Sequence, residues 1–273
     1  MYTVGSVPYA NAKPLVWWLG ASAGPVRVVY AVPSQLPAML DSGAADAVLA
    51  SSYEALITPG RRIASGLCIA SEGPVRSVRL FSKVPFGEIQ VLALDRSSMT
   101  SNALAGIILA ERYHVRPKAI AEEPSLEGML GMADAAVLIG DKGMSASGDG
   151  LHEMDLGEAW TDLTDLPFVW AMWMSGDGLT TELVRLLQDA WREFDGARLD
   201  GRQGQLVEQF ALEAGWTPAT MEDYLLRTIK FELGKRELEG LREFQRRLIL
   251  NGDLEAIHFP TVVESGEAVT SPA

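Results

Sequence analysis

The sequence predicts an α/β protein built of two lobes with a ligand cleft between them. In the first half of the 273-residue chain, short apolar runs with strand character alternate with runs of helical periodicity, as in domains with a mostly parallel sheet. A second unit of this kind begins near Phe86, and a strand over residues 168–174 is expected to return the chain to the first lobe. We therefore expect residues 1–85 and 175–273 to form lobe 1, and residues 86–174 to form lobe 2.

The first lobe is expected to open with three short strands, each followed by a helix or a polar loop. Pro8 ends the first strand. Pro14 lies in the first turn of the first helix, where its missing N–H group costs no hydrogen bond, and Ser34 is expected to cap the second helix. The expected strands cover residues 2–7, 26–31 and 45–50, the helices cover residues 11–19 and 34–41, and extended segments follow at residues 67–70 and 78–82.

The second unit repeats this pattern, and the last third of the chain is helical. Residues 140–142 (GDK) indicate a turn, residues 217–218 (TP) indicate a helix start, and residues 251–252 (NG) indicate a helix end. Residues 260–273 lack periodicity and are expected to form a mobile tail. The expected strands here cover residues 90–94, 135–139 and 168–174, and the expected helices cover residues 102–113, 179–194 and 238–251.

Composition excludes several classes of function. The 36 acidic and 23 basic residues give a formal net charge of −13, so neither nucleic acid nor an anionic membrane is an expected partner. The single cysteine excludes a disulfide framework, and the three histidines lie too far apart in sequence to suggest a metal site. The opening residues lack the features of a secretory signal, and no apolar stretch is long enough to span a membrane. We expect a cytoplasmic protein without a metal or other cofactor.

The strongest candidate site from the residues alone is the polar loop at residues 97–102 (SSMTSN), which precedes a predicted helix. Ligands of open parallel sheets bind beyond the carboxyl ends of strands, close to helix N-termini. Hydroxyl, amide and free backbone N–H groups at the positive end of a helix suit a carboxylate or a phosphate. Ordinary helix capping is the alternative, because serine and threonine favour that position in any case. The residues expected to bind the anion are Ser98, Thr100, Ser101 and Asn102.

Two further polar loops follow predicted strands and are expected at the same cleft; the first contains Tyr9 and Asn11, and the second contains Ser51 and Ser52. Asp141 could face the cleft as an acid or base, although an ordinary turn aspartate is the favoured explanation. Cys68 lies in an apolar run that is expected to bury it. The sequence contains no Gly-x-Ser-x-Gly, His-Glu-x-x-His or Gly-x-Gly-x-x-Gly motif, so no familiar catalytic class is indicated.

Several blocks of sequence, in order over about residues 1–175, resemble the chorismate dehydratases of the futalosine pathway of menaquinone biosynthesis. Residues 4–15 (VGSVPYANAKPL) are similar to that family's usual Gly-x-x-x-Tyr-Leu-Asn-x-x-Pro-Leu. The departures are Ala10, where leucine is usual, and Ala12, where threonine or cysteine is usual. The other similar blocks are residues 51–54 (SSYE), 72–78 (EGPVRSV), 138–142 (LIGDK), 155–160 (DLGEAW) and 166–173 (LPFVWAMW).

The resemblance implies a two-lobed, type II periplasmic-binding-protein fold used as an enzyme. The implied reaction is that of a carbon–oxygen lyase, which removes water from the dicarboxylate chorismate and gives 3-[(1-carboxyvinyl)oxy]benzoate. Asn11 and Ser77 are implied as the catalytic polar residues around the reacting ring, and the loop before the helix is implied as a carboxylate clamp, assisted by Arg76 or Arg79. The residues expected to bind the substrate are Tyr9, Ser52, Arg76, Ser98, Thr100, Ser101, Asn102 and Asp141.

Other functions are compatible with the same fold. A solute-binding protein that delivers an anion to a transporter would carry an export signal, which the opening residues do not resemble. The sister enzyme that forms 1,4-dihydroxy-6-naphthoate usually opens with Cys-Pro-Asn-Asp-Thr, a string that is absent here. A regulatory ligand-sensing domain is less expected, because no DNA-binding helix-turn-helix segment precedes the fold. The dehydratase is therefore the preferred hypothesis.

Overall fold

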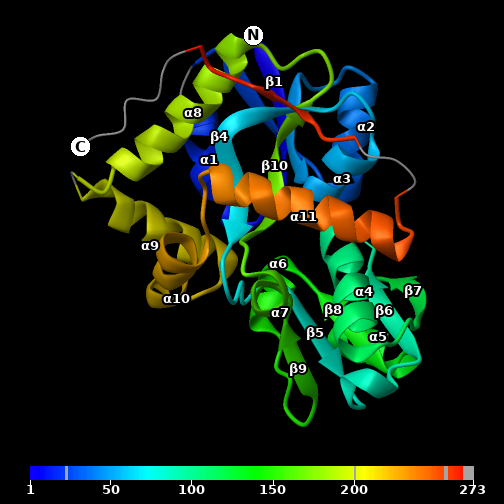
Figure 1. Ribbon diagram of the computed structural model, residues 1–273. Coiled ribbons are helices and arrows are strands. Elements are labelled where there is room, and N and C mark those ends of the chain that lie inside the picture. The colour runs from blue at the N-terminus through cyan, green and yellow to red at the C-terminus, as the bar shows by residue number, and fades with distance from the viewer. Residues whose placement is uncertain (22–23, 97, 200, 255–257, 267–273) are drawn as a thin grey trace.

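The computed structural model describes residues 1–21, 24–96, 98–199, 201–254 and 258–266, which form two α/β lobes, each built on one sheet (Figure 1). The predicted α/β class is confirmed. In these ranges, no helix is both long enough and apolar enough to cross a membrane.

The first lobe contains a six-stranded sheet covered by helices. Its strands are β1 (Tyr2–Ser6), β2 (Val26–Tyr30), β3 (Ala47–Ser51), β4 (Arg62–Ser71), β10 (Phe168–Ser175) and β11 (Thr261–Val263). Their order in the sheet is β11-β4-β10-β3-β1-β2; β1 is parallel to both of its neighbours, whereas β10 is antiparallel to β3 and β4. Nearly every residue of β3 and β10 is buried, as expected for strands with helices on both faces.

The helices of this lobe come from both ends of the chain. They are α1 (Lys13–Ala21), α2 (Leu36–Asp41), α3 (Ser52–Ile57), α8 (Thr181–Gly196), α9 (Arg202–Ala214), α10 (Pro218–Asp223) and α11 (Lys235–Asn251). Short 3₁₀ turns at Ala10–Ala12 and Pro33–Gln35 precede α1 and α2, and a π-helical turn at Tyr224–Thr228 follows α10. The predicted cap at Thr217 is confirmed, because its hydroxyl accepts the N–H of Thr220 at 3.1 Å.

The second lobe contains a five-stranded sheet. Its strands are β5 (Arg79–Ser82), β6 (Val91–Asp95), β7 (Lys118–Glu122), β8 (Ala135–Leu138) and β9 (His152–Asp155), in the order β7-β6-β8-β5-β9. Its helices are α4 (Met99–Tyr113), α5 (Leu126–Met132), α6 (Gly140–Ser145) and α7 (Leu156–Thr164), with a 3₁₀ turn at Phe86–Glu88. Successive residues of β5 point to opposite faces: Leu80 packs in the main core, and Phe81 packs in a smaller cluster with Met129 of α5.

The chain passes between the two sheets twice. The first crossing is residues 72–78, between β4 and β5, and the second is residues 165–167, between α7 and β10. Both crossings lie earlier in the chain than the boundaries expected at residues 86 and 174, because β5 already pairs within the second sheet and β10 already pairs within the first.

Three local expectations differ from the structure. Ser34, expected to cap the second helix, lies in the 3₁₀ turn before α2, and Gln35 holds the N-cap position. The segment expected as a turn around Asp141 is the first turn of the short helix α6. Thr261–Val263, expected within a mobile tail, forms β11 and pairs in parallel with β4, so that part of the prediction is wrong. Residues 267–273 of the expected tail lie outside the described residues.

Helix α11 belongs to the first lobe but contacts both lobes, and it runs across the junction between them in Figure 1. The buried guanidinium of Arg247 forms an ion pair with Glu111 of α4 and lies 5.7 Å from the ring centre of Trp160 in α7. At Gly240, a Cβ atom would lie 2.1 Å from the carbonyl oxygen of Pro167 in the second crossing. Only glycine permits this close contact.

We expect Gly240→Ala to lower the free energy of unfolding. Overpacking costs about 1–3 kcal/mol, which exceeds the gain in helix propensity of up to about 1 kcal/mol. Gly204→Ala in α9 is the matched control, because no atom lies within 4 Å of the added methyl group there, and it should be neutral or stabilising. Urea denaturation of both variants measures the difference. Equal stability of the two would contradict the close packing of α11 on the crossing.

Candidate active site

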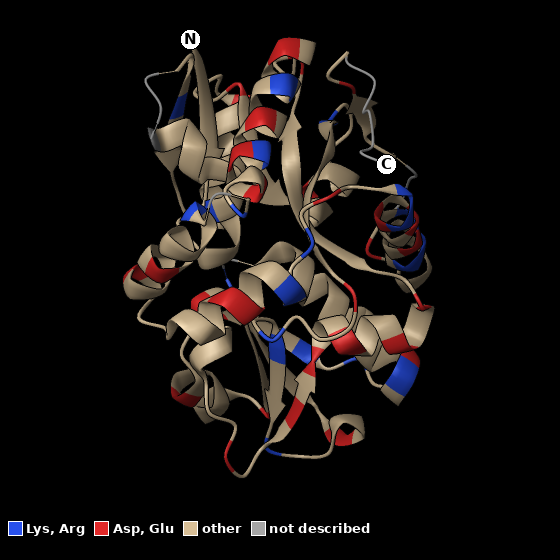
Figure 2. Ribbon diagram, turned by 90° about the vertical axis from the view of Figure 1, so that its left-hand side faces the viewer, with Lys and Arg blue, Asp and Glu red and all other residues tan. Residues whose placement is uncertain are grey.

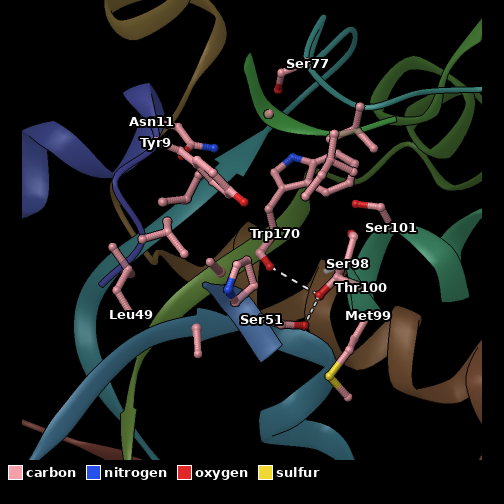
Figure 3. A pocket seen from close by; sticks show the side chains of 18 of the residues that line it. Tyr9, Asn11, Leu49, Ser51, Ser77, Ser98, Met99, Thr100, Ser101 and Trp170 are labelled. Carbon is pink, nitrogen blue, oxygen red and sulfur yellow. Dashed lines mark hydrogen bonds between the residues drawn. The ribbon is translucent and has the colours of Figure 1, made fainter. Parts of the chain in front are cut away.

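A cavity with about 710 Å³ of empty space, part of it open to solvent, lies between the lobes (Figure 3). It is situated beyond the carboxyl ends of β1, β3, β6 and β8, where ligands of open α/β sheets bind. Most of its wall is apolar. The polar residues that line it are Tyr9, Asn11, Ser51, Ser77, Ser98, Thr100 and Ser101. The cavity thus brings together six of the ten residues that were expected to act on or bind the substrate, namely Tyr9, Asn11, Ser77, Ser98, Thr100 and Ser101.

Charged groups are kept away from this cavity. Lysine and arginine are interspersed with aspartate and glutamate over the outer helices, as Figure 2 shows. Among the described residues, no lysine, arginine, aspartate or glutamate lines the cavity. An anion inside it would therefore be held by hydroxyl, amide and backbone N–H groups rather than by a cation.

Ser77 lies in the first crossing, and the carboxylate of Asp155 holds this segment in place. Asp155 accepts the N–H groups of Val75 at 3.0 Å and of Arg76 at 2.5 Å. Arg76 has a φ of 66°, a left-handed conformation that is unusual for a residue with a side chain. On the far side, a Cβ atom at Gly143 would lie 2.3 Å from the Ser77 carbonyl oxygen, so α6 packs directly against the crossing. This packing fixes the backbone that carries Ser77, whose side chain lines the cavity.

Neither arginine near Ser77 lines the cavity. The Arg76 side chain is exposed and forms an ion pair with Asp223. Arg79 donates to the carbonyl oxygens of Gly143 at 3.1 Å and Ala146 at 2.9 Å, and it also pairs with Glu153. The expected assistance from Arg76 or Arg79 in binding a carboxylate therefore has no counterpart in this arrangement.

The first turn of α4 supplies the opposite wall of the cavity. The helix begins at Met99, earlier than expected, so Thr100 and Ser101 are buried in its first turn; the Ser98 side chain makes no capping hydrogen bond to the helix. The Thr100 hydroxyl already has protein partners: it pairs with the Ser51 hydroxyl, accepts the Tyr53 N–H at 3.3 Å and lies 3.4 Å from the Trp170 carbonyl oxygen. Ser101 points toward the centre of the cavity (Figure 3). The backbone N–H groups of this turn and Ser101 are therefore the better candidates for contacting an anion.

Two of the residues expected to bind the substrate, Asn102 and Ser52, do not line the cavity. The Asn102 amide donates to the Asp95 carbonyl oxygen at 2.9 Å, on the side of α4 that faces away from the cavity. Ser52 is fully buried, and its hydroxyl donates to the Val169 carbonyl oxygen at 2.6 Å. Its neighbour Ser51, at the end of β3, lines the cavity instead. Of the two neighbouring serines, only Ser51 therefore reaches the cavity.

Asp141 lies at the border of the cavity and joins the two lobes. Its carboxylate, in the first turn of α6, accepts the N–H group of Ala10 in the first lobe. Burial raises the pKa of Asp141, against the opposing effects of this hydrogen bond and of the nearby Lys13 charge. Asp141 is thus a contact between lobes beside Asn11 rather than part of the cavity wall.

Sequence reasoning missed Tyr224, a buried residue of the π-helical turn. Its hydroxyl donates to Ser77 Oγ at 2.8 Å, and Asn11 is a second hydrogen-bond partner of the same hydroxyl. The two residues implied as catalytic are therefore joined through one buried phenol. Within the described part of the chain, no three histidine, cysteine, aspartate or glutamate side chains lie close enough together to hold a metal ion.

We expect Asp141→Asn to be more stable than the wild type at neutral pH but not below about pH 4. Because burial raises the pKa of Asp141 in the folded state, the folded protein binds this proton more tightly than the unfolded chain, and stability falls as the pH rises through that window. Asparagine keeps an acceptor for the Ala10 N–H but carries no charge. Melting temperatures of both proteins across this pH range measure the effect. If Asp141→Asn were less stable than the wild type at pH 7, the negative charge of Asp141 would stabilise the folded protein, which would contradict this prediction.

Comparison with known proteins identifies the family. Residues 2–249 match the family model described as menaquinone biosynthesis. The chain is 31% identical over 267 residues to a protein from Thermus thermophilus named chorismate dehydratase; the match covers 90% of this chain and 95% of that protein.

Solved structures show the fold at low sequence identity. The alkanesulfonate-binding protein SsuA from Xanthomonas axonopodis pv. citri superposes with a TM-score of 0.71 at 15% identity, covering 96% of this chain and 98% of that one. A Candida albicans protein described as having the generic periplasmic binding protein fold has a TM-score of 0.62 at 12% identity, covering 94% and 91%. The chain therefore belongs to the menaquinone biosynthesis family and has the periplasmic-binding-protein fold.

Proposed function

We propose that the protein is a chorismate dehydratase that acts in menaquinone biosynthesis by the futalosine route, and that its products are 3-[(1-carboxyvinyl)oxy]benzoate and water. The observation that carries this proposal is the cavity in which Asn11 and Ser77 lie across from the first turn of α4 (Figure 3). The family match and the name of the Thermus relative support the same substrate and reaction.

The first turn of α4 is the proposed site for one substrate carboxylate. The positive end of a helix contributes roughly 0.3–2 kcal/mol to binding an anion. Each charge-assisted hydrogen bond from a backbone N–H or from Ser101 adds about 1.5–3 kcal/mol. Together these contacts can hold a carboxylate in a cavity whose described lining contains no cation.

The proposed reaction breaks two bonds of the substrate ring. The electron pair of the C3–H bond becomes the π bond between C3 and C4, which completes the aromatic ring. The C4 hydroxyl leaves with its bonding pair and takes up a proton, so that one molecule of water forms. Because aromatisation supplies much of the driving force, positioning and charge stabilisation are what the protein must provide.

Ser77 and Asn11 are the proposed catalytic residues. The Ser77 hydroxyl would donate a hydrogen bond to the departing C4 hydroxyl, and Asn11 would orient the substrate. A carboxylate of the substrate is the proposed base for the C3 proton. Asp141 is a poorer candidate, because its carboxylate accepts the Ala10 N–H and does not line the cavity.

Incubation of the purified protein with chorismate tests this function. We expect the absorbance of an aromatic product and a mass lower than that of chorismate by one water molecule. Recovery of unchanged chorismate from a protein that binds it would indicate a solute-binding protein of the same fold and would contradict the proposal.

We expect Ser77→Ala to lower kcat/KM for chorismate by about 10²-fold, because one well-placed donor in a site that excludes water contributes about 3 kcal/mol to transition-state stabilisation. Ser175→Ala is the matched control. Its hydroxyl is buried and donates to the Asp46 carbonyl oxygen at 2.5 Å, at the opposite end of β10 from the cavity. The control should lose stability and keep wild-type kinetics. Normal kinetics in Ser77→Ala would make Ser77 a structural residue.

Ser101→Asp should raise the KM for chorismate by about tenfold or more, because it places a negative charge beside the bound carboxylate. The helix dipole favours an aspartate in this turn, whereas burial of its charge disfavours it, so the melting temperature is measured together with KM. Thr180→Ala is the control that should change stability and not binding. Thr180 caps α8 by accepting the Leu183 N–H at 3.1 Å. Loss of this cap should cost about 1 kcal/mol of stability with no change in KM. Unchanged chorismate binding by Ser101→Asp would move the carboxylate site away from α4.

A further inference from the structure

Tyr224 connects the two proposed catalytic residues. It is 1% exposed, and its ring meets that of Trp216 edge-on, with 5.5 Å between the ring centres. Its hydroxyl lies behind the cavity wall, 2.8 Å from Ser77 Oγ, and has Asn11 as its other partner. The phenol is thus fixed by packing on one side and by two hydrogen bonds on the other.

The hydrogen atoms of this network can be assigned by counting. A phenol has one hydrogen, and that of Tyr224 goes to Ser77 Oγ. Asn11 must then present an amide N–H group to the Tyr224 oxygen, which leaves the Asn11 carbonyl oxygen as an acceptor for another partner. The hydroxyl hydrogen of Ser77 is not used in this network, and among the described residues it has no protein acceptor. Since Ser77 lines the cavity, this hydrogen can point to a bound ligand.

Which atoms donate the hydrogen bonds in this network depends on whether the Tyr224 hydroxyl keeps its hydrogen. Burial raises the pKa of this phenol, and the negative charges of Asp141 and Asp155 add to the effect; the hydrogen bonds to Ser77 and Asn11 act against it. Tyr224 therefore keeps its hydrogen at neutral pH and remains a donor. Because the Tyr224 hydroxyl donates to Ser77 Oγ, the Ser77 hydroxyl hydrogen cannot point toward Tyr224.

We propose that Tyr224 is a positioning residue for the elimination, which turns the Ser77 hydrogen toward the departing hydroxyl and the Asn11 carbonyl oxygen toward the substrate. This inference rests on the proposed function. Tyr224 itself does not line the cavity, so its effect must pass through Ser77 and Asn11. The residue lies in the C-terminal helical region, beyond the sequence blocks that point to those two residues.

The test is a double-mutant cycle on Tyr224→Phe and Ser77→Ala with chorismate as the substrate. Phenylalanine keeps the ring and its packing on Trp216 and removes only the hydroxyl. We expect Tyr224→Phe to lower kcat about tenfold or more while KM changes less than about threefold, because an oriented donor matters most in the transition state. Once Ser77 is alanine, the Tyr224 hydroxyl has lost one of the two groups that it orients and keeps only Asn11. Adding Tyr224→Phe to Ser77→Ala should then lower kcat by a smaller factor than it does in the wild type.

Tyr2→Phe is the matched control. The Tyr2 hydroxyl donates to Glu182 at 2.8 Å and lies 3.1 Å from the Thr180 hydroxyl, at the far end of β1 from the cavity, so its removal should leave kcat unchanged. Near-ultraviolet circular dichroism and the melting temperature verify that each variant is folded. Wild-type kcat in a folded Tyr224→Phe protein, or effects of the two substitutions that simply multiply, would overturn the role of Tyr224.

Product formation by the wild-type protein distinguishes a failure of this inference from a failure of the proposed function. Absence of product with wild-type protein contradicts the dehydratase proposal directly. In that case the same cycle is measured in the Kd for chorismate by calorimetry. Coupling between Tyr224→Phe and Ser77→Ala in Kd would still support the orienting role, and its absence, or a wild type that does not bind chorismate, would overturn it.

Discussion

The carboxylate of Asp155 is the group on which the arrangement of the cavity depends most. It accepts four backbone N–H groups: those of Val75 and Arg76 in the first crossing, and those of Gly157 and Glu158 at the start of α7. One side chain thus caps a helix of the second lobe and fixes the segment that presents Ser77. The left-handed backbone of Arg76 persists because these bonds offset its strain.

The proposed carboxylate site would rely on dipoles in a protein whose net charge repels anions. With a formal net charge of −13, the chain as a whole attracts no dicarboxylate. Backbone N–H groups and hydroxyls at the start of α4 act only over short distances, and they require an exact fit instead of a general attraction. Their rigidity follows from burial: Thr100 and Ser101 are each 4% exposed, and Thr100 is bound to Ser51 and Trp170 from the other lobe.

Much of the fold could be predicted from local sequence, because strands such as β3 and helices such as α4 carry their own hydrophobic pattern. The same local signal placed Asn11 and the start of α4 near a common cleft, whereas Ser77 was named only through the resemblance to the dehydratase family. It could not separate Ser51 from Ser52, since the last residue of a strand and the first residue of the next helix differ in direction only once the backbone is known. Tyr224 gave no signal at all, because its partner Ser77 lies 147 residues away in the sequence.

The outer edge of β4, a strand from the first third of the chain, finds its hydrogen-bond partners in segments from the last third. β4 is ten residues long and mostly buried, and its outer edge is covered by two short segments of the C-terminal region. Lys230 and Phe231 pair with Ala70 and Cys68, and β11 pairs with the start of the strand. During synthesis, β4 leaves the ribosome long before either segment exists, so the nascent chain carries an open apolar edge of the kind that promotes aggregation. Completion of the last helices and of β11 therefore ends the period in which the chain is most vulnerable to self-association.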